Sequence, residues 1–423
     1  MSSHAIDIRG TSYPVVLPSF RDPRLHLAAV IVSLQVLGQT AFAFRVSIAQ
    51  ILISLGVCAV LEVAIVCGRQ RVLLWPASAL LTGNGVAFIL RVPGTRHGDW
   101  WSTRGWWIFA ATAAVSILSK YVVRIRGEHV FNPSNFGLVL CFLALGSTRA
   151  EPLDFWWGPM SAWLALALAI IVLGGLAILS RLRLLEVAVS FWAAFAAALG
   201  VLAATGHSMT ARWHLGPIAG FEFWRTLVTS PELLVFLFFM ITDPKTVPRR
   251  QGERVVYALA IGLLAALLIA PAQTEYWSKV AVLGALAIVC GARVLPLRPA
   301  VPVRALGLGL AAYVGLLVAA GISTRPVAQA EASHYAGRLP PITILPSKGV
   351  DSTLSTATAR AIAGDLVAAL RKRGHAPVER LSLWLEPGFQ GGSVPVARLE
   401  PGGETVELGL NAGRSVVTRV RPP

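Results

Sequence analysis

Residues 238–250 read FFMITDPKTVPRR and join the end of an apolar segment to a basic cluster. Thr242, Asp243 and Pro244 lie at the junction. Proline interrupts a helix, and Lys and Arg accumulate in loops on the cytoplasmic side of a membrane. The stretch therefore predicts the cytoplasmic end of a transmembrane helix, with an acidic side chain at the edge of the bilayer.

The composition extends this prediction to most of the chain. Its 423 residues are 55% hydrophobic and 14% charged, with a mean hydropathy of +0.66. Soluble domains carry about 25% charged residues, so most of this chain is expected to contact a lipid bilayer as a helical multi-pass protein. Ten to eleven spans are predicted, at 26–44, 47–67, 72–90, 106–121, 132–146, 157–179, 184–204, 226–242, 255–271, 276–293 and 303–321.

Three regions follow from the spans: a polar arm at 1–25, a transmembrane domain at 26–321 and a soluble tail at 322–423. The arm has no short apolar core of the kind that marks a cleaved signal peptide. The tail predicts a small α+β unit with a helix over 353–373. Most of the basic loop residues fall on the side of the N-terminus, which predicts a cytoplasmic N-terminus and an extracytoplasmic tail in the inner or plasma membrane.

The net charge of +16 comes from basic residues spread over the membrane loops, so nucleic acid is not an expected partner. Four cysteines lie in or beside predicted spans without a C-x-x-C spacing, so they are expected as small buried side chains and no metal site is predicted. No nucleotide-binding P-loop, G-x-S-x-G or HExxH motif occurs. The residues alone therefore assign no catalytic side chain.

One group of polar residues lies inside the third span. Thr82 and Asn84 belong to the segment PASALLTGNG at 76–85. Two glycines around an asparagine weaken a helix and can leave backbone groups free to bind a ligand or an ion. Alternatively, the glycines allow close packing and Asn84 bonds to a neighbouring helix.

A second group lies in the segment HVFNPSNFG at 129–137. It predicts a helix that begins at Pro133, with Asn132 as its N-cap and Asn135 in its first turn. A helix N-terminus favours a phosphate or carboxylate group, although a capped helix start is the simpler alternative. Three basic residues lie just upstream: Lys120, Arg124 and Arg126.

The third group is Thr242 with Asp243. An acid at a helix C-terminus opposes the helix dipole, so Asp243 is expected to have a partner. The alternatives are a cation, a backbone cap or a ligand hydroxyl. Asp243 is the leading candidate for a group that faces a ligand or an ion, close in space to Asn132 or Asn84.

Two of these segments resemble the NqrB/RnfD family of membrane subunits from redox-driven ion-pumping complexes. Residues 239–244, FMITDP, match the Phe-Met-x-Thr-Asp-Pro segment of that family, and residues 131–133 match Phe-Asn-Pro, with Ser134 in place of alanine. The UnbU-type proteins associated with enediyne biosynthesis are similar in both segments. The resemblance covers most of residues 26–295. It implies two inverted five-helix repeats with broken helices, here followed by one extra helix. The expected breaks are at Gly83–Gly85 and before Pro231.

The resemblance also implies FMN or riboflavin as a cofactor. Family members link FMN to the threonine of a Ser-Gly-Ala-Thr segment after the Asn-Pro helix. The loop 147–156, STRAEPLDFW, has no such segment, so covalent FMN is not expected in the membrane domain. Residues 351–358 of the tail, DSTLSTAT, faintly resemble an attachment segment with Thr358 as the acceptor, but a helix cap is favoured there.

The resulting hypothesis is a subunit of a translocase-type complex that takes part in flavin-linked transmembrane electron transfer. It would be coupled to ion transport or serve a biosynthetic pathway, with other membrane redox subunits or a soluble flavoprotein as partners. The alternative is a small-molecule or ion transporter of the same fold without a redox cofactor. A scaffold whose tail docks a partner is the third hypothesis.

Overall fold

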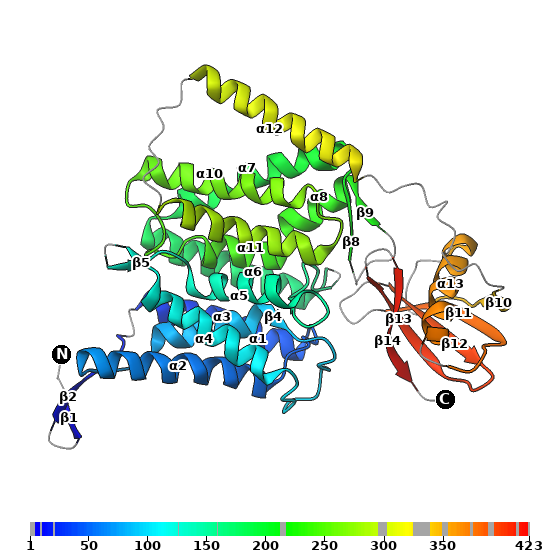
Figure 1. Cartoon of the computed structure of the whole chain (residues 1–423), viewed down its shortest axis with the longest axis horizontal. Helices are drawn as coiled ribbons and strands as arrows, with labels where there is room; N and C mark the ends of the chain where they lie inside the picture. The colour runs from blue at the N-terminus through cyan, green and yellow to red at the C-terminus, as the bar shows by residue number, and fades with distance from the viewer. Residues whose placement is uncertain are drawn as a thin grey trace.

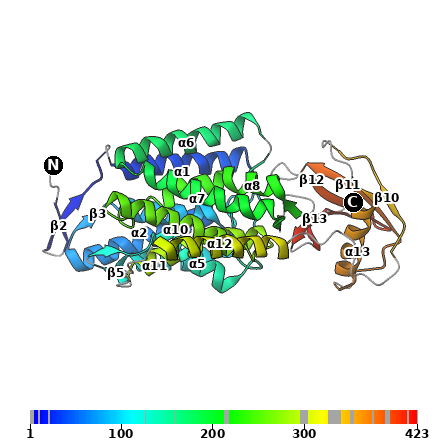
Figure 2. The same cartoon turned by 90° about the horizontal axis from the view of Figure 1, so that it is seen from above.

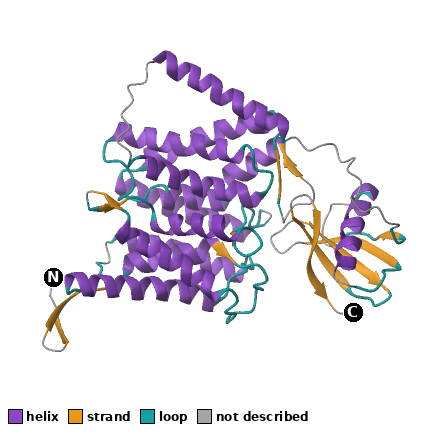
Figure 3. Ribbon diagram, in the orientation of Figure 1, coloured by secondary structure: helices purple, strands orange, loops and turns teal. Residues whose placement is uncertain are grey.

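A bundle of helices forms the larger part of the molecule, and strands with one helix form its C-terminal part (Figure 1, Figure 3). The computed structural model describes residues 5–8, 11–19, 22–125, 127–158, 160–211, 217–294, 303–324, 339–348, 354–372, 375–387, 393–411 and 414–421.

The helices of the bundle are α1 (Pro23–Thr40), α2 (Ile48–Gln70), α3 (Ala77–Ile89), α4 (Trp106–Val122), α5 (Pro133–Leu145), α6 (Ala162–Leu182), α7 (Leu185–Ala204), α8 (Gly220–Thr229), α9 (Pro231–Val235), the π-helical turn η1 (Phe236–Met240), α10 (Gln251–Ile269), α11 (Glu275–Ala292) and α12 (Val303–Ser323). Each predicted span overlaps one of them, if α8, α9 and η1 are taken as one interrupted helix. Among the described residues, six helices are long and apolar enough to cross a membrane: α2, α6, α7, α10, α11 and the interrupted helix Gly220–Met240. The chain is therefore a helical protein of the multi-pass membrane type.

Two of the apolar helices are too short to cross a bilayer. Helices α3 and α5 have 13 residues each, or about 20 Å at 1.5 Å per residue. After α3 the chain forms β4 (Leu90–Arg91), which pairs antiparallel with β7 (Glu151–Pro152). Leu90, Arg91 and Pro152 are buried. Non-helical backbone is tolerated at membrane depth where protein covers it, and these strands meet that condition.

The Gly-Asn-Gly segment does not interrupt α3, so the predicted break at residues 83–85 is wrong. A Cβ atom on Gly83 would lie 2.5 Å from the backbone oxygen of Ser54 in α2, and one on Gly85 would lie 3.1 Å from Oγ of Ser134. The glycines therefore allow α3 to approach its neighbours closely. The chain is interrupted instead before Pro231, as expected, where Ser230 caps α9 by accepting a hydrogen bond from Leu233 N (3.1 Å).

The loops gather at two ends of the bundle. The Asp243 end holds β5 (Arg124–Ile125), β6 (Glu128–His129), the turn at 241–250 and β3 (Leu73–Leu74), which pairs with β2 of the hairpin β1 (Ala5–Ile8) and β2 (Thr11–Val16). The Glu275 end holds the β4–β7 pair, the loop 270–274 and the pair β8 (Ser208–Thr210) with β9 (Pro217–Ala219). Figure 2 shows the bundle from a second side, with β2 and β5 at the end opposite to α8.

The tail has a hydrophobic core of its own. Its sheet has the order β10 (Ile342–Ile344), β11 (Arg380–Pro387), β12 (Ser393–Glu400), β13 (Thr405–Asn411) and β14 (Arg414–Arg421). Within the described strands of this sheet, β10–β11 is the parallel pair and the other neighbours are antiparallel. Helix α13 (Thr356–Lys372) is amphipathic and packs its apolar face on the sheet, burying Ile362 and Leu366 with Leu383 and Leu399. The tail is thus a small α+β unit.

One histidine makes the stability of this unit depend on pH. Nδ1 of His375 lies 2.9 Å from the carbonyl of Ala376 and Nε2 lies 3.2 Å from the Glu404 carboxylate. Both partners are acceptors, so both ring nitrogens donate only in the imidazolium form. These contacts raise the pKa of His375 above its ordinary value of 6.5, with the Ala376 carbonyl as the largest cause.

We expect the tail to lose stability as the pH rises. Because the folded pKa is raised, the contribution of His375 is complete below pH 6.5 and is lost as the pH passes through the raised value. Hydrogen–deuterium exchange of the full-length protein, corrected for intrinsic rates, should show faster exchange in β13 at pH 8 than at pH 6. His375→Asn should remove the difference, and peptides of α10 serve as the internal control. An equal difference in the variant would contradict the assignment.

Candidate functional site

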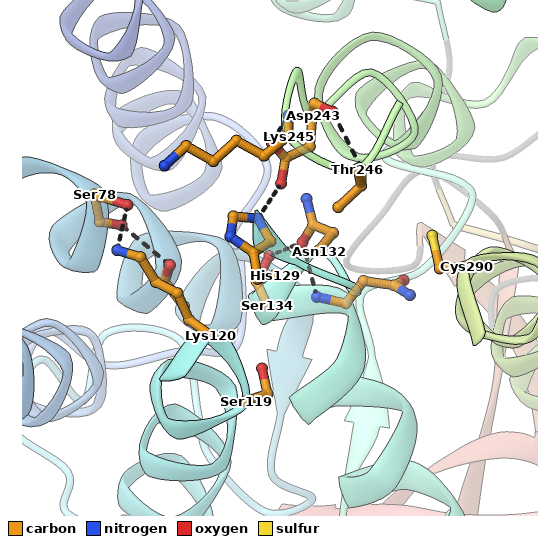
Figure 4. Close-up of polar contacts among 12 residues, drawn as sticks. Ser78, Ser119, Lys120, His129, Asn132, Ser134, Asp243, Lys245, Thr246 and Cys290 are labelled. Carbon is orange, nitrogen blue, oxygen red and sulfur yellow. Dashed lines mark hydrogen bonds and ion pairs between the residues drawn. The ribbon is translucent and has the colours of Figure 1, made fainter. Parts of the chain in front are cut away.

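The segments that contain Asn132 and Asp243 meet at one end of the bundle. The side-chain amide of Asn132 donates to the carbonyl of Met240 (3.3 Å), and Nε2 of His129 lies 3.2 Å from Oδ2 of Asp243 (Figure 4). The two segments are more than a hundred residues apart in the chain. The fold therefore brings together the start of α5 and the end of η1.

The start of α5 explains why Asn132 can make this contact. Its Oδ1 accepts hydrogen bonds from the backbone N–H of Asn135 (3.1 Å) and from Oγ of Ser134 (2.9 Å), which caps the helix. Pro133 is the first helical residue, as expected. The amide nitrogen of Asn132 then points to Met240, in the last turn of η1, where carbonyl groups lack helical partners. One side chain thus satisfies two helix ends.

Asp243 is held by the backbone and by a histidine. Its Oδ1 accepts from Lys245 N (3.1 Å), and its carbonyl accepts from Oγ1 of Thr246 (3.1 Å). Of the three expected partners, the structure contains the backbone cap. The side chain of Asp243 is 18% exposed and that of His129 is 8% exposed. This partly open pair presents a carboxylate that can attract a cation.

Two predicted site residues bond to their own helices instead. Oγ1 of Thr242 donates to the carbonyl of Phe238 (2.5 Å), and Oγ1 of Thr82 donates to that of Ser78 (3.0 Å). Both are buried. Such bonds are common for Thr inside helices and use the hydroxyl proton. Thr242 therefore lies next to Asp243 without facing the same partners.

Asn84 of α3 and Asn135 of α5 are both buried and bond to different helices. Oδ1 of Asn84 accepts from Nε2 of Gln35 in α1 (3.5 Å), and Nδ2 of Asn135 donates to the carbonyl of Leu283 in α11 (3.0 Å). The remaining oxygens, Oε1 of Gln35 and Oδ1 of Asn135, are buried without a partner. Unpartnered buried oxygens are costly, so they mark a place for a ligand or water.

Thr358 belongs to α13, which lies in the tail, away from the helices of the bundle (Figure 1). Its backbone N–H donates to Oγ of Ser355 (3.1 Å), and the two hydroxyl oxygens are 2.7 Å apart. The start of α13 is therefore capped by Ser355, and Thr358 is not part of the site at the Asp243 end.

A buried ion pair beside the site was not foreseen from the sequence. Glu62 of α2 accepts hydrogen bonds from Lys120, from the hydroxyl of Tyr121 (3.1 Å) and from Ala79 N (3.0 Å) at the start of α3. Lys120 also donates to Oγ of Ser78 (2.9 Å; Figure 4). Lys120 is therefore neutralised by Glu62 and does not serve the α5 N-terminus. Arg124 donates to the carbonyl of Gly127, and Arg126 lies outside the described residues.

In the described part of the chain, no group of three or more His, Cys, Asp or Glu side chains is arranged to hold a metal ion. The four cysteines are unpaired: Cys58, Cys67, Cys141 and Cys290. Cys290 lies 3.7 Å from the hydroxyl of Tyr257. Comparison with protein-family models and with curated proteins gave no match to this chain.

The Glu62–Lys120 pair yields a stability prediction. Lys120→Met leaves the Glu62 carboxylate, whose side chain is 2% exposed, without its counter-charge. Removing one partner of a buried pair costs about 3–5 kcal/mol, whereas replacing both partners costs much less. Thermal unfolding of the purified protein should therefore rank Lys120→Met below the double variant Glu62→Gln/Lys120→Met.

The matched control is Arg249→Met, which breaks the exposed Arg249–Glu128 pair at the same end. Exposed pairs contribute about 0–1 kcal/mol, so this variant should unfold near the wild-type temperature. A double variant as unstable as Lys120→Met would contradict the assigned role of the pair.

Proposed function

We propose that this chain is an integral membrane subunit of the NqrB/RnfD type, similar to the UnbU-type branch, that takes part in flavin-linked transmembrane electron transfer. The transfer is coupled to ion transport or serves a biosynthetic pathway. Other membrane redox subunits or a soluble flavoprotein complete the complex. The observation that carries the proposal is the contact of the two motif segments through Asn132–Met240 and His129–Asp243.

The packing of the helices supports an inverted repeat of α1–α5 and α6–α11. Helix α2 packs on α3 and α4, as α7 packs on α8 and α10, and α4–α5 corresponds to α10–α11. Contacts α1–α6 and α5–α11 join equivalent helices across the two halves. The third helix of each half is followed by related segments, LRVPGT at 90–95 and ITDPKT at 241–246. They lie at opposite ends of the bundle, as inversion requires, and α12 is the extra helix.

The orientation follows from the basic residues at the Asp243 end. This end is the cytoplasmic one in the proposal, because the described loops there carry most of the loop Lys and Arg residues. The N-terminal arm is then cytoplasmic, and the tail lies on the outer side of the inner or plasma membrane. Examples of these basic residues are Arg69, Arg71, Arg181, Arg183, Lys245, Arg249 and Arg250.

The residues present fit a non-covalent flavin better than a covalent one. At Thr358 the Ser355 hydroxyl already caps α13, so the place that a phosphate would take is filled. In the bundle, Oε1 of Gln35 and Oδ1 of Asn135 are buried acceptors without partners, suited to an N–H group of FMN or riboflavin. A bound flavin would supply one-electron and two-electron redox chemistry, while the side-chain oxygen of Gln35 or of Asn135 would accept a hydrogen bond from its N–H group.

The absorption spectrum of the protein purified in mild detergent tests the proposal. We expect a flavin spectrum that is lost on denaturation and gel filtration, because the attachment is non-covalent. Fluorescence that survives denaturation in a gel would instead indicate covalent FMN, with Thr358→Ala as the variant that should abolish it. A protein free of flavin in every mild preparation would contradict the redox proposal.

Asp243→Asn tests the site itself. The amide oxygen can still accept from Lys245 N, but the charge opposite His129 is lost. We expect normal membrane insertion and a thermal unfolding temperature near wild type, with electron transfer in membrane vesicles reduced at least about tenfold, equivalent to 1.4 kcal/mol of transition-state free energy. Glu128→Gln, which alters only an exposed pair, is the control. Unchanged activity in Asp243→Asn would exclude Asp243 from the site.

The second candidate function is small-molecule or ion transport without a redox cofactor. Two observations favour it: the loop 147–156 lacks a flavin attachment segment, and the interrupted helix Gly220–Met240 has the break that transporters use at their substrate sites. Absence of flavin together with solute uptake by proteoliposomes would establish this alternative.

A further inference from the structure

Five charged side chains gather at the Glu275 end of the bundle. Arg91 follows α3, Glu232 lies in the first turn of α9, Asp154 follows β7, and Glu275 and Lys279 lie in the first turns of α11. Four of them are more than nine-tenths buried: Arg91 (6% exposed), Glu232 (8%), Glu275 (6%) and Lys279 (3%). They lie far from the Asp243 site and have no part in the proposed function.

Lys279 is fully paired within this cluster. It donates to the carbonyl of Leu153 and lies 3.1 Å from Oε1 of Glu275 and 3.7 Å from Oδ1 of Asp154. Oε1 of Glu275 also accepts from Phe155 N (2.6 Å). The side chain of Asp154 is 31% exposed, so this group of charges reaches solvent.

Arg91 and Glu232, in contrast to Lys279, keep buried polar atoms without hydrogen-bond partners. Nη1 of Arg91 donates to the carbonyls of Ala87 (3.1 Å) and Leu90 (2.8 Å), but Nε and Nη2 have no partner. Oε2 of Glu232 is buried without a partner as well. Arg91 and Lys279 are close enough for their charges to act on Glu232. A buried carboxylate without hydrogen bonds is costly, and taking up a proton relieves that cost.

We propose that Glu232 is a proton-binding site that is loaded from the Glu275 end. The proton comes from bulk water, which reaches this end at the 31% exposed side chain of Asp154, and it converts the Glu232 carboxylate to a neutral carboxylic acid. When the proton leaves, Arg91 and Lys279 stabilise the carboxylate that forms. The Nε–H and Nη2–H groups of Arg91 have no partner and can donate hydrogen bonds to a carboxylate or to a bridging water molecule.

The surroundings of Glu232 limit which groups can take part. Helix α6, which packs on α9, has no titratable side chain over 162–180. Helix α8 carries Glu222 and Arg225 on its exposed side. Arg91 from β4, Asp154 from the loop, and Glu275 and Lys279 from α11 are therefore the charged groups that face Glu232 from the described elements packed around it.

Infrared difference spectroscopy of the full-length protein in liposomes, between acid and alkaline buffer, tests this inference. A protonated buried carboxyl has a C=O stretching band that shifts in deuterium oxide. We expect such a band to appear as the pH falls and to be lost in Glu232→Gln. Glu253→Gln, which removes an exposed carboxyl on α10, is the matched control and should retain the band.

Asp154→Asn keeps the test decisive if Glu232→Gln does not fold. Removing a negative charge near Glu232 should move the midpoint of the band to lower pH. An unchanged band in folded Glu232→Gln, an unchanged midpoint in Asp154→Asn, or a Glu232 band that is independent of pH would each overturn the inference. No electron donor or flavin is involved, so failure here and failure of the proposed redox function are separate results.

Discussion

A carbonyl group at the end of a membrane helix must find a hydrogen-bond donor inside the protein, and at Met240 that donor is Asn132. The same asparagine caps α5, so the end of η1 and the start of α5 are fixed to one another. His129 and Asp243 then meet because they flank this contact. The site at the Asp243 end is therefore a consequence of two helices that stop within the protein and satisfy each other's unpaired groups.

Buried charges in this bundle fall into two kinds. Glu62 and Lys120 are in direct contact and join α2 to α4, whereas Glu275 and Lys279 are in contact one turn apart on α11. Arg91 and Glu232 keep unpartnered atoms. Burying such unpartnered groups costs free energy. In membrane proteins, buried ionisable groups of this kind are most often associated with function rather than with stability. The contrast separates the structural charges of the bundle from those that need a further partner.

The helices were largely predictable, because an apolar run long enough to cross lipid has few other structures open to it. The break before Pro231 and the cap at Asn132 were also readable, since both depend on local backbone chemistry. The sequence left two interpretations of the glycines around Asn84 open, because only the approach of α2 shows that they serve packing. The pairs Glu62–Lys120 and His129–Asp243 join distant parts of the chain, and no local pattern specifies them.

The shortness of α3 and α5 has an electrical consequence. Each is about 20 Å long, against about 30 Å of hydrocarbon in the surrounding bilayer. Charged side chains lie at both ends of α3, where Glu62 bonds to Ala79 N and Arg91 bonds to the carbonyl of Leu90. If a membrane voltage fell over the length of these helices alone, the field along them would be about one and a half times that in the neighbouring lipid. A charge moved through this region would then respond more steeply to voltage than one crossing the bilayer elsewhere.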